Sequence, residues 1–343
     1  MGVSDQDLEW HDTMDWEVEG KGWDDTARHF ERLPARAEGI VREPVWNLSR
    51  CSAGLSLCFV TDSPCIHARY NLLNETISMA HMPATSHSGL DLYALDAKGH
   101  ERWVGISPPE GRHVESTLAD GLAPGSRQYT LYLPLYNSPE HLEIGVEAGA
   151  NLQPLPARPE KPILFYGTSI MHGASASRAG MCIPSIVSRR LQRRVINLGF
   201  SGNGIMEPEI ADLLSELDPC LFIVDCLPNM AAPLVAERTI PLVRRIRQTR
   251  PETPILLVED RTYANTGFFP AKAERHLTSR AALRNAWHEL TNAGDEKIHY
   301  LEGERLLPHD GEATVDSSHP TDLGMAAYAD AYEAAIRPIL RQI

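Results

Sequence analysis

Hydrophobic and polar residues follow two different patterns in the two halves of the 343-residue chain. From about residue 45 to 150, short runs alternate apolar and polar residues, and turn-forming residues separate the runs. The segments of this kind are 66–73, 90–95, 129–135 and 142–148. A period of two is typical of half-buried antiparallel strands. Many such strands with turns between them predict a β-sandwich.

The second half contains nearly continuous apolar runs, at 163–167, 195–199, 221–226 and 255–260. Between these runs, apolar residues recur at helical spacing. The residues in question are Ile210, Leu213, Leu214 and Leu217 in one segment, and Leu283, Ala286, Trp287 and Leu290 in another. Buried strands that alternate with amphipathic helices predict an α/β domain with a parallel sheet covered on both faces.

A proline-rich stretch, NLQPLPARPEKP at 151–162, separates the two patterns. Proline fixes φ and has no backbone N–H for a sheet ladder, so we expect this stretch to be a linker. We therefore predict an N-terminal β-sandwich domain over 1–155 and a C-terminal α/β domain over 156–343.

Polar residues follow three of the predicted parallel strands. Ser169 comes after 163–167, the segment SGNG (201–204) after 195–199, and LPNM (227–230) after 221–226. Ligands of open α/β sheets bind at the carboxyl ends of the strands. The three segments therefore mark a candidate site.

Composition and charge narrow the function classes. The formal net charge is −14 and no basic cluster stands out, which argues against nucleic acid or an anionic membrane as a partner. The acidic N-terminal segment lacks the apolar region of a signal peptide, and no run approaches the roughly 20 apolar residues of a membrane span. We expect a soluble, cytoplasmic protein. The six cysteines form no CxxC pair, so we expect free thiols and no zinc site.

A serine hydroxyl needs a base to act as a nucleophile, and the base needs an orienting partner. The segment DSSHP (316–320) supplies both, because Asp316 and His319 are three residues apart. Two alternatives stay open at this point. Ser169 alone could merely cap a helix, and Asp316 with His319 could belong to a metal site or a structural loop, although a metal site needs three or four ligands.

An acyl-transfer transition state also places negative charge on the former carbonyl oxygen. Three groups could donate hydrogen bonds to it: the backbone N–H of Ser169, the backbone N–H of Gly202 and the side-chain amide of Asn229. Gly202 could instead be only a turn glycine, and Asn229 only a turn residue. The loss of one such donor typically raises the barrier by about 3 kcal/mol.

The segments GTSI, NLGFSGNG, DCLPN and DSSHP resemble, in this order, the four sequence blocks of the SGNH hydrolases, or GDSL-type esterases. The resemblance covers about 163–340 and implies a flavodoxin-like three-layer αβα domain. It also implies a triad of Ser169, His319 and Asp316, with an oxyanion hole formed by Ser169, Gly202 and Asn229. The segment SGLDLYAL (88–95) resembles the GxDLY motif of an N-terminal domain found in one branch, for which we expect a jelly-roll-like sandwich.

We therefore predict a serine esterase that needs neither cofactor nor metal. We expect a small acyl group, such as acetyl, on a saccharide or similar polyol, with His172 and Glu259 as candidate substrate contacts. The alternatives are a thioesterase or lysophospholipase with the same triad, and a carbohydrate-binding protein with an inactive hydrolase fold. An oligomer is possible. For Asp91, Tyr93, Trp16 and Trp23 we favour structural packing, and for Glu259 with its neighbours Asp260 and Arg261 a salt bridge is the competing interpretation.

Overall fold

The structure, a computed structural model, describes residues 8–342. Residues 1–7 of the acidic N-terminal segment lie outside the described residues. The chain divides into two compact units, Met1–Ala35 with Ser49–Pro159 and Ser177–Gly180, and Arg36–Leu48 with Glu160–Ala176 and Met181–Ile343. Arg36–Leu48 precedes residue 155 in the sequence but belongs to the second unit. Ser177–Gly180 follows residue 155 but belongs to the first unit. The domain boundaries inferred from the sequence stay a prediction.

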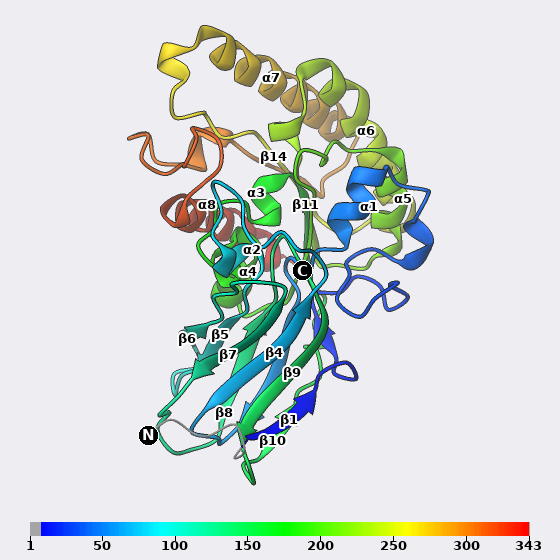
Figure 1. The fold of residues 1–343 in the computed structure, drawn as a ribbon. Helices are drawn as coiled ribbons and strands as arrows, with labels where there is room; N and C mark the ends of the chain where they lie inside the picture. The colour runs from blue at the N-terminus through cyan, green and yellow to red at the C-terminus, as the bar shows by residue number, and fades with distance from the viewer. Residues whose placement is uncertain (1–7, 343) are drawn as a thin grey trace. The chain divides into compact units, whose positions relative to one another are not determined.

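The first unit contains two antiparallel sheets (Figure 1). One has the order β1 (Leu8–Asp12), β9 (Pro139–Glu147), β4 (Ile66–Leu72) and β7 (His113–Ala119). The other has the order β10 (Leu152–Pro154), β3 (Ser56–Thr61), β8 (Arg127–Tyr132), β5 (Asp91–Leu95) and β6 (Glu101–Ile106), and β2 (Val18–Glu19) also pairs with β3. Buried side chains from both sheets form one hydrophobic cluster, which confirms the predicted sandwich.

The alternating pattern explains why these segments are strands. Along β4, Ile66, Ala68, Tyr70 and Leu72 are buried, whereas the residues between them are half-buried or exposed. A strand places successive side chains on opposite faces, so one face of β4 enters the core. Trp16 and Trp23, each only 8% exposed, also lie in the interior, as the packing interpretation expected.

The proline-rich stretch is not entirely a linker. Leu152, Gln153 and Pro154 pair with Thr61, Val60 and Phe59 of β3 in antiparallel register. β10 is an edge strand, and a proline at the edge of a sheet can leave its missing N–H on the unpaired side. The expectation that the prolines would exclude a sheet ladder was therefore wrong for the first residues of the stretch.

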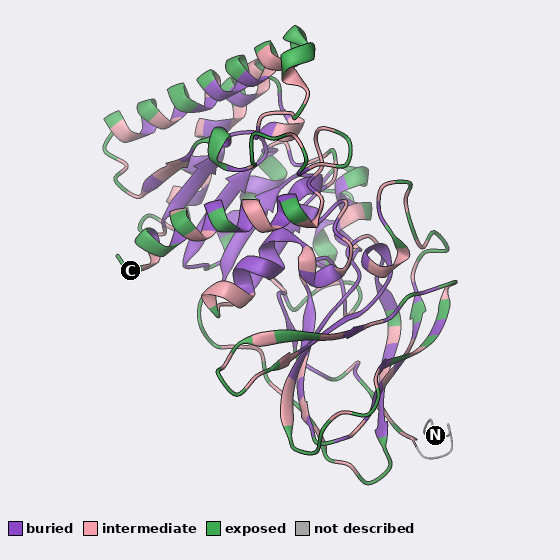
Figure 2. Cartoon of the chain, turned by 90° about the vertical axis from the view of Figure 1, so that its left-hand side faces the viewer, coloured by how far each residue is buried: buried purple, intermediate pink, exposed green. Residues whose placement is uncertain are grey.

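The second unit contains a parallel sheet with the strand order β12 (Val195–Gly199), β11 (Ile163–Gly167), β13 (Leu221–Asp225), β14 (Ile255–Val258) and β15 (Ile298–Leu301). In chain order this is 2-1-3-4-5, the flavodoxin-like arrangement. Every residue of β11, β12 and β13 is buried, and Figure 2 shows the sheet enclosed by helices. This confirms the predicted α/β fold class.

The helices of this unit lie on both faces of the sheet (Figure 1). On one face α4 (Ile183–Leu191) packs against α8 (Asp322–Leu340) and the short α3 (Ser169–His172). On the other face α6 (Ala232–Thr249) packs against α5 (Pro208–Glu216) and α7 (Pro270–Asn292). The segment with α1 (Glu43–Ser49) is tied to α5 by the ion pairs Arg36–Glu216 and Arg42–Glu207. None of the helices within residues 8–342 is long and apolar enough to cross a membrane.

Candidate active site

Three neighbouring strands of the parallel sheet, β12, β11 and β13, end at the same level. Gly167 at the end of β11 pairs with Gly199 at the end of β12 and with Asp225 at the end of β13. Ser169 follows two residues after Gly167, Gly202 three residues after Gly199, and Asn229 four residues after Asp225. The three loops therefore leave one edge of the sheet side by side, as expected for strands in parallel register.

Ser169 is the first residue of α3 rather than its cap. The N-cap is Thr168, whose side-chain oxygen accepts a hydrogen bond from the backbone N–H of Ile170 at 3.4 Å. Gly173 ends the helix in the left-handed conformation. The interpretation of Ser169 as a mere helix cap is therefore wrong, because Thr168 already fills that position.

The hydroxyl of Ser169 meets the imidazole of His319. The distance from Ser169 Oγ to His319 Nε2 is 2.9 Å, and the distance from His319 Nδ1 to Asp316 Oδ2 is 2.7 Å. The carboxylate can hold the tautomer with a proton on Nδ1, which leaves Nε2 free to accept the serine proton. The structure thus brings together the three residues that the sequence analysis proposed as a triad.

Asp316 also organises the loop that carries the imidazole. Its Oδ1 accepts hydrogen bonds from the backbone N–H groups of Ser318 (2.9 Å) and His319 (2.7 Å). Partial burial opposes ionisation, but the backbone N–H of His319, its imidazole and the N–H of Ser318 outweigh burial and lower the pKa of Asp316 to about 2. The carboxylate is therefore ionised at neutral pH and faces His319 as an anion.

Two glycines in the second sequence block serve different purposes. A Cβ on Gly199 would lie 2.2 Å from the backbone nitrogen of His172, so only glycine lets α3 approach β12 this closely. Gly202 has a φ of +70° with open space around it, and it is exposed. A positive φ strains most other residues, and the open space leaves the backbone of Gly202 accessible to a ligand.

Asn229 ends a short 3-10 turn, Leu227–Asn229. Its side-chain Oδ1 is buried and has no hydrogen-bond partner among the described residues. A buried polar atom without a partner is costly, and such atoms concentrate at sites that bind something. The unpartnered Oδ1 is an acceptor and fits a ligand that donates a hydrogen bond, whereas a bond to an oxyanion would come from Nδ2 of the same amide.

The two candidate substrate contacts are placed differently from the expectation. His172 is fully buried in α3, and Glu259 is 1% exposed. The carboxylate of Glu259 accepts hydrogen bonds from Arg284 (2.7 Å), Tyr300 (2.6 Å) and the backbone N–H of Gly303 (2.9 Å). Burial and these bonds support the salt-bridge interpretation of Glu259 and leave neither side chain a surface for substrate in this conformation.

The aspartate of the GxDLY-like segment has a structural role within the first unit. Asp91 is fully buried and accepts hydrogen bonds from the backbone N–H of Gly180 (2.8 Å), Arg178 (3.0 Å) and Trp103 (3.0 Å). The hydroxyl of Tyr93 also bonds Arg178. These contacts fix the segment Ser177–Gly180 within this unit and support the packing interpretation of both residues.

Two buried charged residues near the sheet edge have partners in distant segments that the sequence analysis did not name. Asp225, at the end of β13, accepts a hydrogen bond from Tyr332 at 2.6 Å, and burial raises its pKa to about 7. Arg261 contacts Ser318 of the loop that carries His319. The apolar runs that predicted the strands carry no information on these contacts, because the partners come from distant segments.

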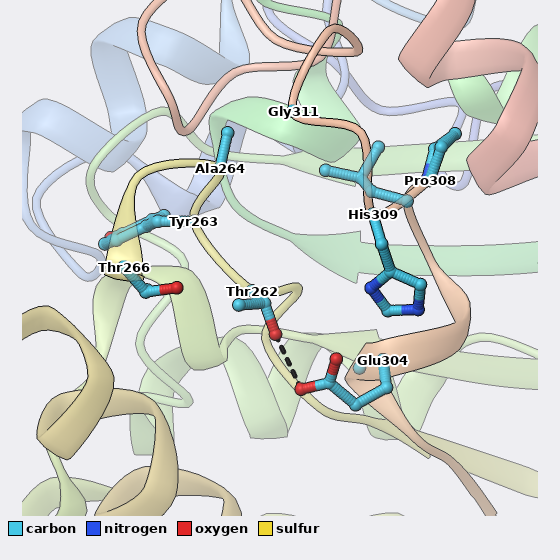
Figure 3. A pocket seen from close by; sticks show the side chains of 10 residues that line it. Thr262, Tyr263, Ala264, Thr266, Glu304, Pro308, His309 and Gly311 are labelled. Atoms are coloured by element: carbon cyan, nitrogen blue, oxygen red, sulfur yellow. Dashed lines mark hydrogen bonds between the residues drawn. The ribbon is translucent and has the colours of Figure 1, made fainter. Parts of the chain in front are cut away.

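A small polar cavity lies beside this loop (Figure 3). It has a volume of about 180 Å³, and its lining includes Thr262, Ala264, Glu304 and His309. Thr262 donates a hydrogen bond to Glu304 at 2.7 Å. The backbone N–H of Ala264 donates to Ser317 O at 3.2 Å, which connects the cavity wall to the loop of Asp316 and His319.

Within the described part of the chain, no three or more His, Cys, Asp or Glu side chains are grouped as a metal site requires.

Comparison with known families agrees with this geometry. The model of the GDSL-like lipase/acylhydrolase family matches residues 160–337, which is more than half of the chain. The chain belongs to this family. The model for the N-terminal domain of SGNH hydrolase-type esterases matches residues 8–152. The predicted family and the predicted class of ester hydrolase are thus confirmed.

Solved structures extend the comparison. A protein described as a GDSL-like lipase from Bacteroides ovatus is 31% identical to this esterase, with a TM-score of 0.93 over 97% of this chain and 98% of the other. The salicylyl-acyltransferase SsfX3 of a tetracycline biosynthetic pathway is 19% identical, with a TM-score of 0.77 over 98% of both chains. An acetyl xylan esterase from Butyrivibrio proteoclasticus is 11% identical, with a TM-score of 0.61 over 97% and 99%. No curated protein matches the sequence.

Proposed function

We propose that this esterase hydrolyses small acyl esters, principally acetyl esters of a saccharide or similar polyol, through an acyl-enzyme on Ser169. One observation carries the proposal. Ser169 Oγ lies 2.9 Å from His319 Nε2 while His319 Nδ1 lies 2.7 Å from Asp316 Oδ2. This is the geometry that a serine nucleophile, a general base and an orienting carboxylate require.

In the first half of the reaction, Ser169 Oγ attacks the ester carbonyl carbon and its proton passes to His319 Nε2. The backbone N–H groups of Ser169 and Gly202 and the amide of Asn229 donate hydrogen bonds to the oxyanion. The tetrahedral intermediate then collapses, and the alcohol leaves with the proton from His319. Donors preorganised where charge develops supply a large part of the rate enhancement of such enzymes.

In the second half, His319 takes a proton from water, and the resulting hydroxide attacks the acyl-enzyme carbonyl. Collapse of the second intermediate releases the carboxylic acid and returns the proton from His319 to Ser169 Oγ. Asp316 stays ionised throughout and stabilises the imidazolium that forms in each half. The cycle consumes one ester and one water and needs no further reactant.

The cavity beside the acid–base loop supports a polyol as the alcohol. Its volume of about 180 Å³ is more than ten times the roughly 10–15 Å³ that a cavity needs to hold one water. Thr262, Thr266, Glu304 and His309 contribute polar side chains to its wall, which suits a ligand that presents hydroxyl groups. The shared fold of the acetyl xylan esterase is consistent with this substrate class. We assign the cavity to the alcohol portion of the substrate.

The triad is tested by Ser169→Ala in the full-length protein, with Ser185→Ala as the matched control. Ser185 is a buried serine of α4 whose hydroxyl lies 3.1 Å from Cys182 Sγ. With p-nitrophenyl acetate, we expect Ser169→Ala to lower kcat at least 10³-fold, because loss of the nucleophile removes the covalent route. Ser185→Ala should keep kcat within about twofold of wild type. Substantial hydrolysis by Ser169→Ala would refute the acyl-enzyme at this residue.

The acyl group and the alcohol are tested separately. We expect kcat/KM to fall from p-nitrophenyl acetate to the octanoate, and mass spectrometry should detect acetate loss from acetylated saccharides. A preference for octanoate or longer chains would favour the thioesterase or lysophospholipase alternative. Background hydrolysis of every ester by wild type and Ser169→Ala alike, with saccharide binding retained, would favour the binding protein.

A further inference from the structure

An arginine and an aspartate are buried together directly after β14. Asp260 is fully buried and Arg261 is 1% exposed, and the guanidinium of Arg261 bonds Asp260 Oδ1. Charged side chains are almost never fully buried without a partner, and a buried pair must recover a large desolvation cost. The pair therefore calls for an explanation beyond the stability of the sheet.

The remaining bonds of Arg261 are directed to one residue. Its Nε donates to the backbone oxygen of Ser318 at 3.0 Å, and its second terminal nitrogen bonds Ser318 Oγ. Ser318 directly precedes His319 and donates its own backbone N–H to Asp316. The planar fork of the guanidinium thus holds the residue that lies between the carboxylate and the imidazole.

Pro320 is the one buried residue of the segment 316–320, and Asp316 to His319 are half-buried or exposed. Asp316 is 46% exposed and the side chain of His319 is 24% exposed. The loop closes on itself through Val315 N–H to His319 O at 2.9 Å, which fixes its shape but not its place on the sheet. The backbone N–H of Ala264 and the amino group of Lys272 bond Ser317 at 3.2 and 3.4 Å, which are longer contacts than that of Arg261 Nε.

Asp260 reaches a second loop of the site as well. Its Oδ2 lies 3.2 Å from Arg275 Nη1, and Arg275 Nη2 donates to the backbone oxygen of Pro228 at 2.9 Å. Pro228 immediately precedes Asn229. His276 Nδ1 also lies 3.3 Å from Asp260 Oδ2. One carboxylate therefore connects the loop of His319 to the loop of Asn229 through two arginines.

We propose that Arg261, anchored by Asp260, is a positioning residue that fixes Ser318 and so keeps His319 Nε2 within hydrogen-bond distance of Ser169 Oγ. The inference rests on the proposed function, because it assigns His319 the role of the base. Arg261 touches neither the substrate nor the reacting atoms. It acts through the main chain of the loop, and a displacement of about 1 Å can lower a catalysed rate about 10²-fold.

The deciding variant is Arg261→Lys in the full-length protein, with Arg32→Lys as the matched control. Lysine keeps the charge beside Asp260 but cannot make two parallel bonds to Ser318. Arg32 is also buried, at 2% exposed, and its Nε donates to Cys51 O at 2.8 Å in the other unit. Arg32→Lys therefore reports the effect of the same change at a buried arginine remote in sequence from the triad residues.

We expect Arg261→Lys to lower kcat for p-nitrophenyl acetate about 10²-fold while KM stays within about twofold. The pH at which kcat/KM is half-maximal should also shift, because a loosened loop changes the environment of the base. Arg32→Lys should leave kcat and the pH profile within experimental error, even where it lowers the melting temperature. A merely structural role of Arg261 would lower the melting temperature without the change in kcat and pH profile.

A folded Arg261→Lys protein with kcat within twofold of wild type would overturn the inference. If Arg261→Lys does not fold, Ser318→Ala takes its place, because that variant removes one bond to Arg261 and leaves the buried pair intact. We expect a threefold to tenfold lower kcat for Ser318→Ala, and an unchanged kcat would again overturn the inference. If Ser169→Ala is inactive while Arg261→Lys or Ser318→Ala has normal activity, only the positioning role is refuted. If Ser169→Ala is active, the proposed function itself is refuted.

Discussion

The two partners of the Ser169–His319 hydrogen bond are held in contrasting ways. Ser169 is 6% exposed and begins a short helix whose backbone presses against Gly199. His319 lies in a loop of half-buried and exposed residues that hydrogen bonds fasten to Arg261. The position of the hydroxyl therefore depends on close main-chain packing, and the position of the imidazole depends on polar contacts. Substitutions that change side-chain volume should therefore displace Ser169, and substitutions that remove hydrogen bonds should displace His319.

The largest effect is expected from the polar side of this comparison. Asp316→Asn replaces the anion that faces His319 Nδ1 and no longer selects the productive tautomer, so we expect kcat to fall about 10³-fold. Because the pKa of Asp316 is about 2, the wild-type carboxylate is ionised from about pH 5 to about pH 8, and the loss should stay constant across that range. Steady-state kinetics with p-nitrophenyl acetate measure both quantities.

The control for this change is Asp310→Asn. Asp310 is an exposed aspartate in the same connection before α8, and its Oδ1 accepts the backbone N–H of Glu312 at 3.0 Å. It should leave kcat within about twofold of wild type. Equal kcat for the two variants would show that Asp316 is only a turn-forming residue.

On the packing side, Gly199→Ala should be the most damaging small change. The new Cβ would lie 2.2 Å from the nitrogen of His172 and 2.7 Å from the carbonyl carbon of Met171, so α3 must move. Overpacking of this kind typically costs about 1–3 kcal/mol, and displacement of Ser169 should lower kcat about 10²-fold. Urea unfolding and kcat test both effects. Gly267→Ala, which meets nothing within 4 Å, is the neutral control, and a near-normal kcat in Gly199→Ala would contradict the packing argument.

Asp225, which is buried at the end of β13, should make the stability of the fold depend on pH. Its pKa is about 7 in the fold, against about 4 in an unfolded chain, so the unfolded state ionises first as pH rises. The contribution of Asp225 to stability is fully present below about pH 4 and is lost between about pH 4 and pH 7. The free energy of unfolding of Asp225→Asn, relative to that of wild type, should therefore rise by up to roughly 1.4 kcal/mol for each pH unit across that window. Urea unfolding at several pH values tests this, and parallel stability curves for the two proteins would contradict it.

The smallest effect should appear at the polar cavity, away from both partners of the hydrogen bond. His309→Ala removes one exposed polar side chain from its wall. We expect KM for an acetylated saccharide to rise about threefold to tenfold, since one hydrogen bond contributes about 1 kcal/mol. KM for p-nitrophenyl acetate, whose alcohol is not a polyol, should stay within twofold. An equal rise for both substrates would remove the cavity from the proposed alcohol site.

The comparison also shows what the sequence could predict. The runs 163–167 and 195–199 are β11 and β12 residue for residue, because buried parallel strands leave continuous apolar runs. Ser169, Gly202 and Asn229 could be placed at one sheet edge because each follows such a run. His319 lies 150 residues from Ser169. The need of a serine nucleophile for a base with an orienting partner suggested DSSHP, and the family resemblance pointed to the same segment.

The polar side of the site was less predictable. In the sequence, Arg261 is simply a charged residue after a predicted strand. No pattern distinguishes a buried arginine that holds another loop from an exposed arginine at a strand end. His172 lies at a suggestive spacing from Ser169 but is fully buried. The pairing of Leu152–Pro154 with β3 was missed because an edge strand tolerates a proline that a central strand does not. Each of these outcomes depends on contacts with distant segments, which residue type and spacing do not encode.

The exchange of short segments between the two compact units has a practical and an evolutionary consequence. Expression of residues 156–343 alone would discard Arg42, whose guanidinium bonds Asn203 Oδ1 at 2.8 Å, next to Gly202, and pairs with Glu207. Removal of 177–180 would in turn take from Asp91 its bonds to Gly180 and Arg178. Recombination that replaces only one half of such a gene would therefore separate each unit from one of its own segments. The two halves should be inherited together rather than exchanged as independent modules.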